Sequence, residues 1–338
     1  GFIVADTNLQ ALDETIKEVK HFQVGKNLTQ GLGTGMNPEL GKQAAENDKE
    51  KIKEILKGAD FCVLVSCLGG GTGSGASPVF AEILKKLGIL TLGIFTLPFE
   101  FEGGKRIQIA KDSLEKLRPN LNALLIIPNQ KIFQIIDKNT PLKEAFSTIN
   151  KALVESLEGL ITLIYSPGLI NVNFADLKTI LAGRGRLSYL NTAEAKSPDQ
   201  IEEVAKKVLS NPLIPYSVQG AKEILFNIDG GLNLSMSQVE QIGKTISDSI
   251  NPKGRVAFGI THNKKEGIKI TLLADGCKWE EWEQKKEKQK KKAQNKTEEK
   301  PPELLKVQRP EITQISTEKP KKVKIQVRKN ALEMKESI

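Results

Sequence analysis

The chain has 338 residues, of which 39% are hydrophobic and 27% are charged, so it is long enough for two ordinary domains with sizeable cores. Three cysteines and two histidines argue against a disulfide scaffold or a zinc module. The net charge of +9 lies mainly in residues 278–338, which hold 18 of the Lys and Arg and 11 of the Asp and Glu. The other residues hold 32 and 30, so the folded part offers no general case for nucleic-acid binding.

Membrane and export signals are not visible, and cysteine usage fits the reducing cytoplasm. No apolar run approaches the roughly 20 residues that a membrane span needs. Cys62 and Cys67 lie on a predicted buried strand, where we expect small core residues rather than metal ligands, and no protein metal site is predicted. The sequence starts without Met on a strand-like segment, so we expect it to lack its natural N-terminus.

The first part of the chain alternates apolar strands with helices. Residues 2–5 are typical of a short strand, and Asn37, Pro38 and Glu39 predict the start of a helix that continues to Lys57. The continuous apolar run at 61–66 predicts a strand of a parallel sheet that is covered on both faces. Further helices are predicted at 78–87 and 105–117, and further strands at 89–95 and 121–127. This alternation predicts right-handed βαβ units in a doubly wound parallel α/β sheet, with ligand loops at the carboxyl ends of the strands.

The second part predicts a long helix and then a smaller α/β domain. Apolar spacing over residues 142–164 favours one helix that links the two domains. Helices are predicted at 174–181, 199–209 and 237–250, the last capped by Ser235 or Ser237, and strands at 223–228, 255–261 and 268–273. The expected division is a nucleotide-binding domain at 1–141, a central helix at 142–165, a second domain at 166–277, and a disordered basic linker and tail at 278–338.

A glycine-rich loop follows the strand at 61–66. It consists of Gly69, Gly70, Gly71, Thr72, Gly73, Ser74 and Gly75. Five glycines let the backbone approach a polyphosphate, two hydroxyls add donors, and the following helix N-terminus favours negative charge. The loop is not a P-loop, because no lysine follows at the required spacing. A tight structural turn and a dinucleotide site are the alternatives for a loop of this kind.

Several motifs in chain order resemble the FtsZ and tubulin family. They are the loop at 69–75 with Ala76, Ser77 and Pro78, the segment GLGTGMNP at 31–38, PFEFEG at 98–103 with Arg106, IPN at 127–129, Ala145 with Phe146, and NVNFAD at 171–176. The resemblance covers roughly residues 2–276. In this family a further strand and another glycine-rich loop precede the segment that resembles residues 2–5. This sequence holds neither, so we expect it to be a truncated form of an intact protein.

The resemblance implies a GTPase that binds GTP or GDP with Mg²⁺ and polymerises head to tail with further copies of itself. Residues 69–75 would hold the α- and β-phosphates, and Gly33, Thr34 and Gly35 would sense the γ-phosphate. Glu102 and Asn129 would bind ribose, and Arg106 would pair with phosphate or ribose. Phe146 would stack on guanine. The loop at 168–176 would reach the next subunit's nucleotide, with Asp176, Asn173 and Asn171 in the catalytic segment.

Two departures from the family pattern affect the chemistry. The family motif carries a carboxylate where this chain has Asn173, and an amide is no base. The family also places an aspartate beside guanine where this chain has Lys151, which cannot accept a hydrogen bond, so Asn150 is the remaining candidate for the base edge.

Three functions stay open from the sequence. The first is a division-site GTPase whose tail contacts division proteins and membrane tethers. The second is a paralogue that polymerises with little hydrolysis. The third is a dinucleotide-dependent oxidoreductase, for which the glycine loop is a poor match.

Overall fold

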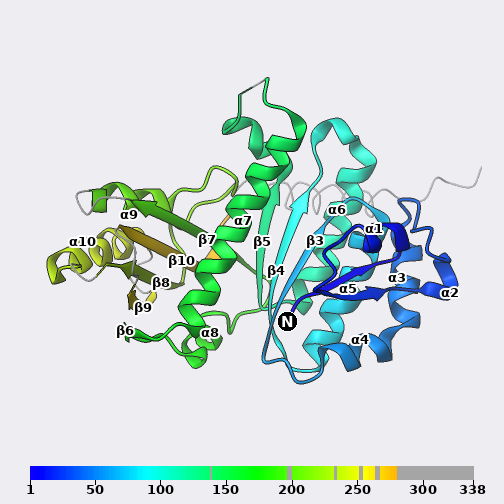
Figure 1. Ribbon diagram of the computed structural model, residues 1–338, viewed down its shortest axis with the longest axis horizontal. Coiled ribbons are helices and arrows are strands. Elements are labelled where there is room, and N and C mark those ends of the chain that lie inside the picture. The colour runs from blue at the N-terminus through cyan, green and yellow to red at the C-terminus, as the bar shows by residue number, and fades with distance from the viewer. Residues whose placement is uncertain (138, 196–199, 232–233, 251–253, 263–266, 280–338) are drawn as a thin grey trace, which may run out of the picture. The chain divides into compact units, whose positions relative to one another are not determined.

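The structure is a computed structural model that describes residues 1–137, 139–195, 200–231, 234–250, 254–262 and 267–279. Its largest feature is a mixed sheet of eight strands, and two further strands form a separate parallel sheet (Figure 1). Residues 280–338, which hold nearly all of the predicted linker and tail, lie outside the described residues. The large sheet has the order β3 (Phe61–Cys67), β4 (Leu90–Leu97), β5 (Ala123–Pro128), β7 (Arg186–Ala195), β10 (Ile268–Cys277), β8 (Glu223–Gly230), β9 (Arg255–His262) and β6 (Gly168–Ile170). The small sheet pairs β1 (Ile3–Asp6) with β2 (Lys20–Gln23).

The first part of the chain is a parallel α/β unit, as its alternating pattern predicted. Strands β3, β4 and β5 pair in parallel, and α5 (Gly71–Lys86) and α6 (Gly104–Leu117) connect them. Asn37 caps α3 (Pro38–Asn47) as predicted, since its side chain accepts hydrogen bonds from the amides of Glu39 and Leu40. The predicted single helix to Lys57 is instead two helices that meet at Asp48, and the second is α4 (Lys49–Leu56). Two short helices precede them, α1 (Leu9–Asp13) and α2 (Lys26–Thr29).

Two further expectations for this part were wrong. Helix α5 begins at Gly71 rather than at Pro78, which lies inside the helix. A proline removes the hydrogen bond to the carbonyl four residues earlier, here Ser74. That carbonyl instead accepts a hydrogen bond of 2.8 Å from the buried hydroxyl of Ser113, so the helix continues through the proline.

Strand β3 is covered only in part. Phe61 and Val63 pack against one hydrophobic core cluster and Cys62 packs against another. Val65 is exposed, however, and among the described strands β3 pairs with β4 alone. Cys67 is exposed rather than in the core, and Cys62 is half-buried, with burial raising its pKa to about 11.

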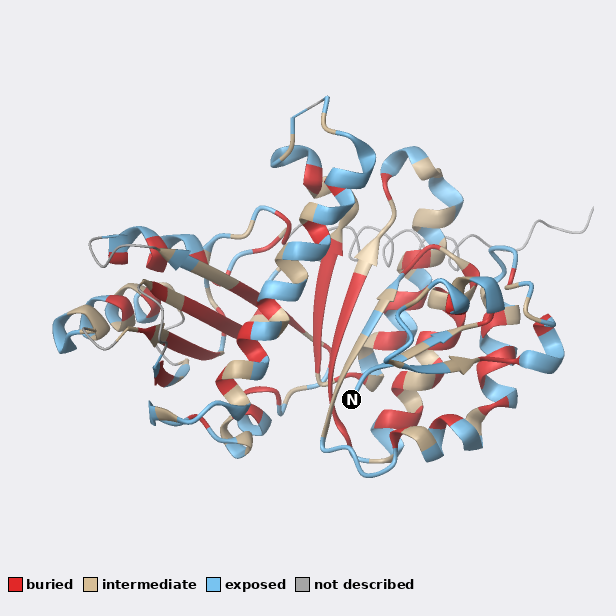
Figure 2. Ribbon diagram, viewed as in Figure 1, coloured by how far each residue is buried: buried red, intermediate tan, exposed pale blue. Residues whose placement is uncertain are grey.

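The second part is built on α7 (Leu142–Tyr165), the predicted long helix. Its buried face packs on β7 and β10, and Figure 2 shows burial concentrated along one side of this helix and along the strands beside it. The other helices are α8 (Phe174–Ile180), α9 (Ile201–Leu209) and α10 (Met236–Ser247). Ser235 caps α10, which confirms one of the two predicted caps.

Strand β7 was missed because polar residues interrupt its apolar pattern. Ser188 and Asn191 are both buried within it. The hydroxyl of Ser188 donates to Asp275 at 2.6 Å, and the amide of Asn191 donates to the carbonyl of Val208 at 3.1 Å. These partners come from distant segments, so periodicity along the chain cannot reveal them.

The two parts meet where β5 pairs briefly with β7. Only Ala123 and Leu124 of β5 are in register with β7. Beyond them the hydroxyl of Tyr216 bridges the strands, accepting from the amide of Ile126 at 3.1 Å and donating to the carbonyl of Ser188 at 2.9 Å. Tyr216 is buried, and burial raises its pKa.

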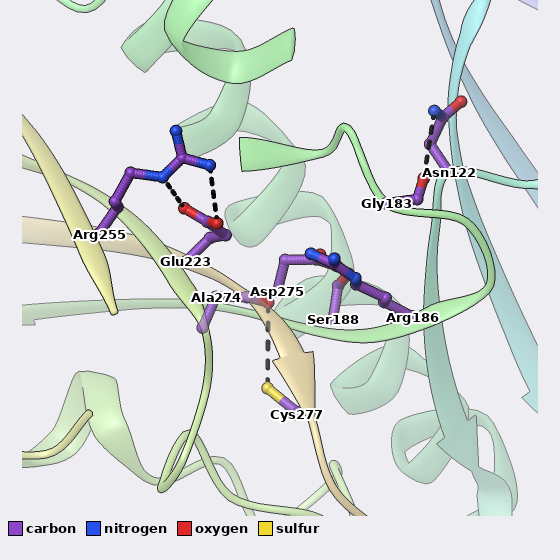
Figure 3. Close-up of polar contacts among 9 residues, drawn as sticks. All are labelled: Asn122, Gly183, Arg186, Ser188, Glu223, Arg255, Ala274, Asp275 and Cys277. Carbon is purple, nitrogen blue, oxygen red and sulfur yellow. Dashed lines mark hydrogen bonds and ion pairs between the residues drawn. The ribbon is translucent and has the colours of Figure 1, made fainter. Parts of the chain in front are cut away.

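A buried carboxylate lies beside this junction. Asp275 accepts from Ser188 and pairs with Arg186 at 3.4 Å (Figure 3). Burial raises the pKa of Asp275, although both partners act in the opposite direction. Both the Tyr216 and the Asp275 hydrogen bonds tie elements far apart in the chain to β7.

Tyr216→Phe tests the bridge between the strands. We expect it to lower the free energy of unfolding by about 1–3 kcal/mol, because the buried Ile126 amide and Ser188 carbonyl lose their partner. Urea denaturation measures this change. Tyr165→Phe is the matched control, because Tyr165 is exposed and its loss should change stability by less than about 0.5 kcal/mol. Equal stability of the two variants would contradict the bridging role.

Candidate functional site

The glycine-rich segment forms the turn between β3 and α5 and the first turn of the helix. The Gly69 amide donates to the hydroxyl of Ser74 at 2.8 Å, which closes the turn. Gly70 occupies the N-cap position, and no side chain caps the helix there. The first amides of a 16-residue helix therefore face outward with the positive end of its dipole, an arrangement suited to a phosphate.

The glycines of this segment serve two different purposes. A Cβ on Gly73 would lie 2.2 Å from the carbonyl oxygen of Cys67, and one on Gly75 would lie 2.0 Å from the carbonyl oxygen of Pro38. These two glycines let α5 pack directly on β3 and α3. A Cβ on Gly70 would have nothing within 4 Å, so this glycine borders open space.

Three threonines join the glycine-rich segment to two earlier loops. The hydroxyl of Thr72 lies 2.6 Å from that of Thr7 and 3.4 Å from that of Thr34. A Cβ on Gly71 would lie 2.2 Å from Oγ1 of Thr34, so these loops are in contact. The structure thus brings together the two glycine-rich segments that were predicted to contact phosphate.

Thr7 was not among the predicted site residues. It follows β1 and is fully buried, and its hydroxyl is part of the threonine group. The signal for it was the segment Asp6-Thr7-Asn8, which lies at the carboxyl end of a strand.

Gly33 and Gly35 have φ angles of +82° and +54°. The loop around Thr34 therefore contains left-handed backbone conformations, which favour glycine.

Glu102 and Arg106 form an ion pair beside these loops. One oxygen of Glu102 accepts from the Phe99 amide at 2.8 Å, and the other pairs with the Arg106 guanidinium. A second guanidinium nitrogen of Arg106 lies 3.7 Å from the sulfur of Met36, in the loop that holds Gly35. Arg106 is partly exposed, so it can exchange this contact for a ligand.

Aromatic rings gather where β4 and β5 end. Phe146 of α7 is 40% exposed and meets the buried ring of Phe99 edge to face, with ring centres 5.8 Å apart. Phe101 stacks on Phe99 at 4.8 Å, and Phe133 lies 5.8 Å from it. Of these rings, only Phe146 was predicted to stack on the base. Phe99 and Phe133 join it through contacts between distant segments, and Phe101 joins through Phe99.

Asn129 and Asn150 are the other residues that were predicted to contact ribose and base. Asn129 follows β5 directly and is half-buried. Asn150 and Lys151 are exposed on α7, one turn beyond Phe146. The ammonium of Lys151 lies 3.8 Å from the carboxylate of Glu155, which follows it by one turn.

The predicted catalytic segment runs from the end of β6 into the first turn of α8. Asn173 and Asp176 cap α8 reciprocally: the Asp176 amide donates to Asn173 Oδ1 at 2.9 Å, and the Asn173 amide donates to Asp176 Oδ2 at 3.0 Å. Asn171 Oδ1 accepts from the Gly168 amide at 2.7 Å. Asn173 is exposed and Asp176 is half-buried, so both remain accessible from outside the chain.

The predicted catalytic segment and the glycine loops lie at opposite ends of α7. Phe146, near the start of α7, contacts Phe99, which follows β4; β4 is parallel to β3 and shares its carboxyl edge. Residues 171–176 follow the other end of this helix of 24 residues, which is about 36 Å long. Figure 1 shows α8 beside the end of α7, away from the end to which β4 and β5 point. One chain therefore does not bring Asp176 to its own glycine loops.

Neither a metal cluster nor a membrane span appears in the part of the chain that the structure describes. No group of three or more His, Cys, Asp or Glu side chains is arranged there to hold a metal ion. None of its helices is long and apolar enough to cross a bilayer.

Comparisons with known proteins match both parts of the chain. Residues 1–137 match the GTPase domain of the tubulin/FtsZ family, and residues 187–278 match the C-terminal domain of the FtsZ family. The chain is 39% identical over 278 residues to the cell division protein FtsZ of Buchnera aphidicola subsp. Baizongia pistaciae. The aligned residues cover 81% of this chain and 72% of that protein.

Solved structures give the same result. An empty FtsZ dimer from M. jannaschii matches with a TM-score of 0.73 and 35% identity, over 81% of this chain and 80% of that one. CetZ2 from Haloferax volcanii, in a protofilament with GTPγS bound, matches with a TM-score of 0.72 over 88% and 90% of the two chains. At 23% identity this second likeness shows the fold alone. From the identity to FtsZ and the two matched domains, we conclude that this chain belongs to the tubulin/FtsZ family.

Proposed function

We propose that this protein is a GTP hydrolase that polymerises head to tail and hydrolyses GTP between adjacent subunits, organising the bacterial division ring. The observation that carries the proposal is the separation of the two halves of the site. The glycine loops lie at one end of α7 and the segment with Asp176 lies at the other. A complete site then requires a second copy, and an interface between unlike faces produces open filaments.

The nucleotide is GTP or GDP, held at the carboxyl ends of β3, β4 and β5. Backbone amides of residues 69–75 hold the α- and β-phosphates, and the loop of Gly33, Thr34 and Gly35 contacts the γ-phosphate. Glu102, Asn129 and Arg106 bind ribose or phosphate, and the guanine base stacks on Phe146, near Asn150. The open space at Gly70 and the uncapped start of α5 support this placement.

Mg²⁺ is expected to bind with the nucleotide. When bound, it offsets phosphate charge during hydrolysis. The described residues hold no acidic cluster, so phosphate oxygens and water would supply most of its ligands.

Asp176 is the proposed catalytic carboxylate, and it would orient water against the γ-phosphate of the neighbouring subunit. Asn173 lies beside it and carries no charge, so it can position water but cannot accept a proton. Asn171 shapes the same turn through its bond to the Gly168 amide. The reaction depends chiefly on positioning and electrostatics, which both sides of the interface would supply.

Asn173→Asp is expected to raise GTP turnover by about tenfold or more, because it adds a second carboxylate at the γ-phosphate. Aspartate is as good an N-cap as asparagine, so α8 should keep its cap. Phosphate release per pelleted subunit measures the effect. Asn47→Asp, at the exposed last residue of α3, controls for the added charge. Unchanged turnover in Asn173→Asp would show that the asparagine does not limit hydrolysis.

A second candidate function is a paralogue that binds nucleotide and polymerises with little hydrolysis, and Asn173 favours it. Pelleting and phosphate release, recorded together across protein concentration with GTP, ATP or no nucleotide, separate the two. Hydrolysis that rises with concentration, together with GTP-dependent pelleting, supports the GTPase. Pelleting without phosphate release supports the paralogue. A folded protein that shows neither pelleting nor phosphate release would refute both candidate functions.

The remaining assignments follow from the same proposal. Residues 1–141 would be the nucleotide-binding domain, 142–165 the central helix and 166–277 the domain that completes the neighbour's site. Residues 278–338 would act as a disordered linker and tail that contacts division proteins and membrane tethers. The protein would work in the cytoplasm at the division site.

A further inference from the structure

Helix α7 lies against the sheet at a residue that has no side chain. Gly159 is buried and faces Thr192 of β7 and Thr271 of β10, which are register partners with hydroxyl oxygens 3.0 Å apart. A Cβ on Gly159 would lie 2.2 Å from Oγ1 of Thr271 and 2.7 Å from Oγ1 of Thr192. Real atoms do not approach this closely, so the distance between α7 and the sheet depends on glycine.

Rotation of the Thr271 side chain does not make room for a methyl group. Its Cγ2 would also lie within 2.8 Å of the added Cβ. A threonine has two heavy γ atoms for three staggered positions, so at least one of the two nearby positions is always occupied. Thr271 is also buried at 3% exposure, which limits its movement. A side chain at position 159 must therefore displace α7 or the strands.

Helix propensity alone would favour alanine at this position. Glycine inside a helix is less stable than alanine where nothing else constrains the site. Gly243 of α10 is such a site, since an added Cβ would have nothing within 4 Å. The two helical glycines therefore predict opposite effects of the same substitution.

We propose that Gly159 is a positioning residue for the reaction between subunits, an inference that rests on the proposed function. By setting how closely α7 lies on β7 and β10, it holds residues 171–176 where they meet the neighbour's nucleotide. Gly159 is twelve residues before Asn171, on the half of α7 that leads into the catalytic segment. Phe146 lies on the other half of α7, and we expect it to remain in place when position 159 is substituted. Such a substitution should therefore lower turnover without lowering GTP affinity.

The test compares Gly159→Ala in two backgrounds, the unsubstituted chain and the Thr192→Ala/Thr271→Ala variant, whose lost γ atoms leave room for the methyl group. In the unsubstituted chain, Gly159→Ala is expected to lower turnover per polymerised subunit about 10- to 100-fold, because a displacement near 1 Å has effects of this size. GTP affinity should stay within about twofold. In the second background, Gly159→Ala should change turnover by less than about threefold. Gly243→Ala should leave turnover unchanged and raise the melting temperature by about 1–3 °C.

Each result decides one question. If Gly159→Ala in the otherwise unsubstituted chain leaves turnover unchanged, the positioning role is overturned and the proposed function stays intact. Equal loss of GTP affinity and turnover, or equal loss in both backgrounds, would also overturn it. If Gly159→Ala does not fold, recovery of folding and turnover in the second background supports the role. No turnover in the unsubstituted chain would refute the proposed function itself.

Discussion

Gly75→Ala is expected to destabilise the fold by about 3 kcal/mol or more, whereas Gly70→Ala should leave stability within about 0.5 kcal/mol. A Cβ on Gly75 would lie 2.0 Å from the Pro38 carbonyl oxygen and 2.7 Å from the Lys42 amide nitrogen. Both are backbone atoms of α3, so no rotation relieves the contact, and α5 must separate from α3. Gly70 has a φ of −94° and open space around it, so alanine fits. Urea unfolding of the two variants measures the difference.

For GTP affinity, Gly70→Ala is the variant in which we expect the loss. Gly70→Ala is expected to weaken binding at least about tenfold, because its methyl group would occupy the space that a phosphate needs at the start of α5. A fluorescent GTP analogue titrated against each folded variant gives the affinity. Normal binding by Gly70→Ala would contradict the phosphate site, and normal stability of Gly75→Ala would contradict the close helix contact.

Asp176→Asn is expected to reduce GTP turnover about 10²- to 10⁴-fold without loss of GTP binding. The substitution removes the negative charge but keeps an oxygen that can accept from the Asn173 amide, so the cap of α8 remains. Filaments should still form, since the change affects the reaction rather than nucleotide binding. Phosphate release measured against the amount of pelleted protein separates these two effects.

A matched control for this variant is Asp112→Asn on α6. The Asp112 carboxylate is exposed and accepts from Gln108, so the same charge is lost away from both halves of the site. Turnover should stay within about twofold of the unsubstituted protein. Equal turnover in the Asp112 and Asp176 variants would rule out Asp176 as the catalytic carboxylate.

Mixing the variants tests whether the site is shared between copies. Gly70→Ala lacks a competent phosphate loop and Asp176→Asn lacks the carboxylate, so neither alone should turn over GTP at a normal rate. A mixture can form interfaces in which the Asp176→Asn chain supplies the loops and the Gly70→Ala chain supplies Asp176. Partial recovery of phosphate release on mixing is expected. No recovery despite joint pelleting would contradict a site built from two copies.

Local chemistry explains which elements were predictable. Asn37 before Pro38 and Ser235 before α10 are caps whose acceptor oxygens act within three residues, and both lie where the pattern indicated. The periodic spacing of apolar residues that predicted α7 is also a pattern of residues close together in the chain. The start of α5 was misjudged because the Ser74 carbonyl, which Pro78 leaves without its helical partner, accepts a hydrogen bond from the Ser113 hydroxyl of another helix.

The amino-acid sequence by itself determined the alternation of strands and helices, the long central helix, and the motifs from which we predict a nucleotide loop and a separate catalytic segment. These features depend on residues close together in the chain, whose spacing and caps act locally. Tertiary structure alone decided that Thr7 joins Thr34 and Thr72, that Ser188 and Asn191 lie in a buried strand, and that Gly159 contacts Thr271. Each of these depends on atoms brought together from distant segments, and a linear pattern carries no record of such distances.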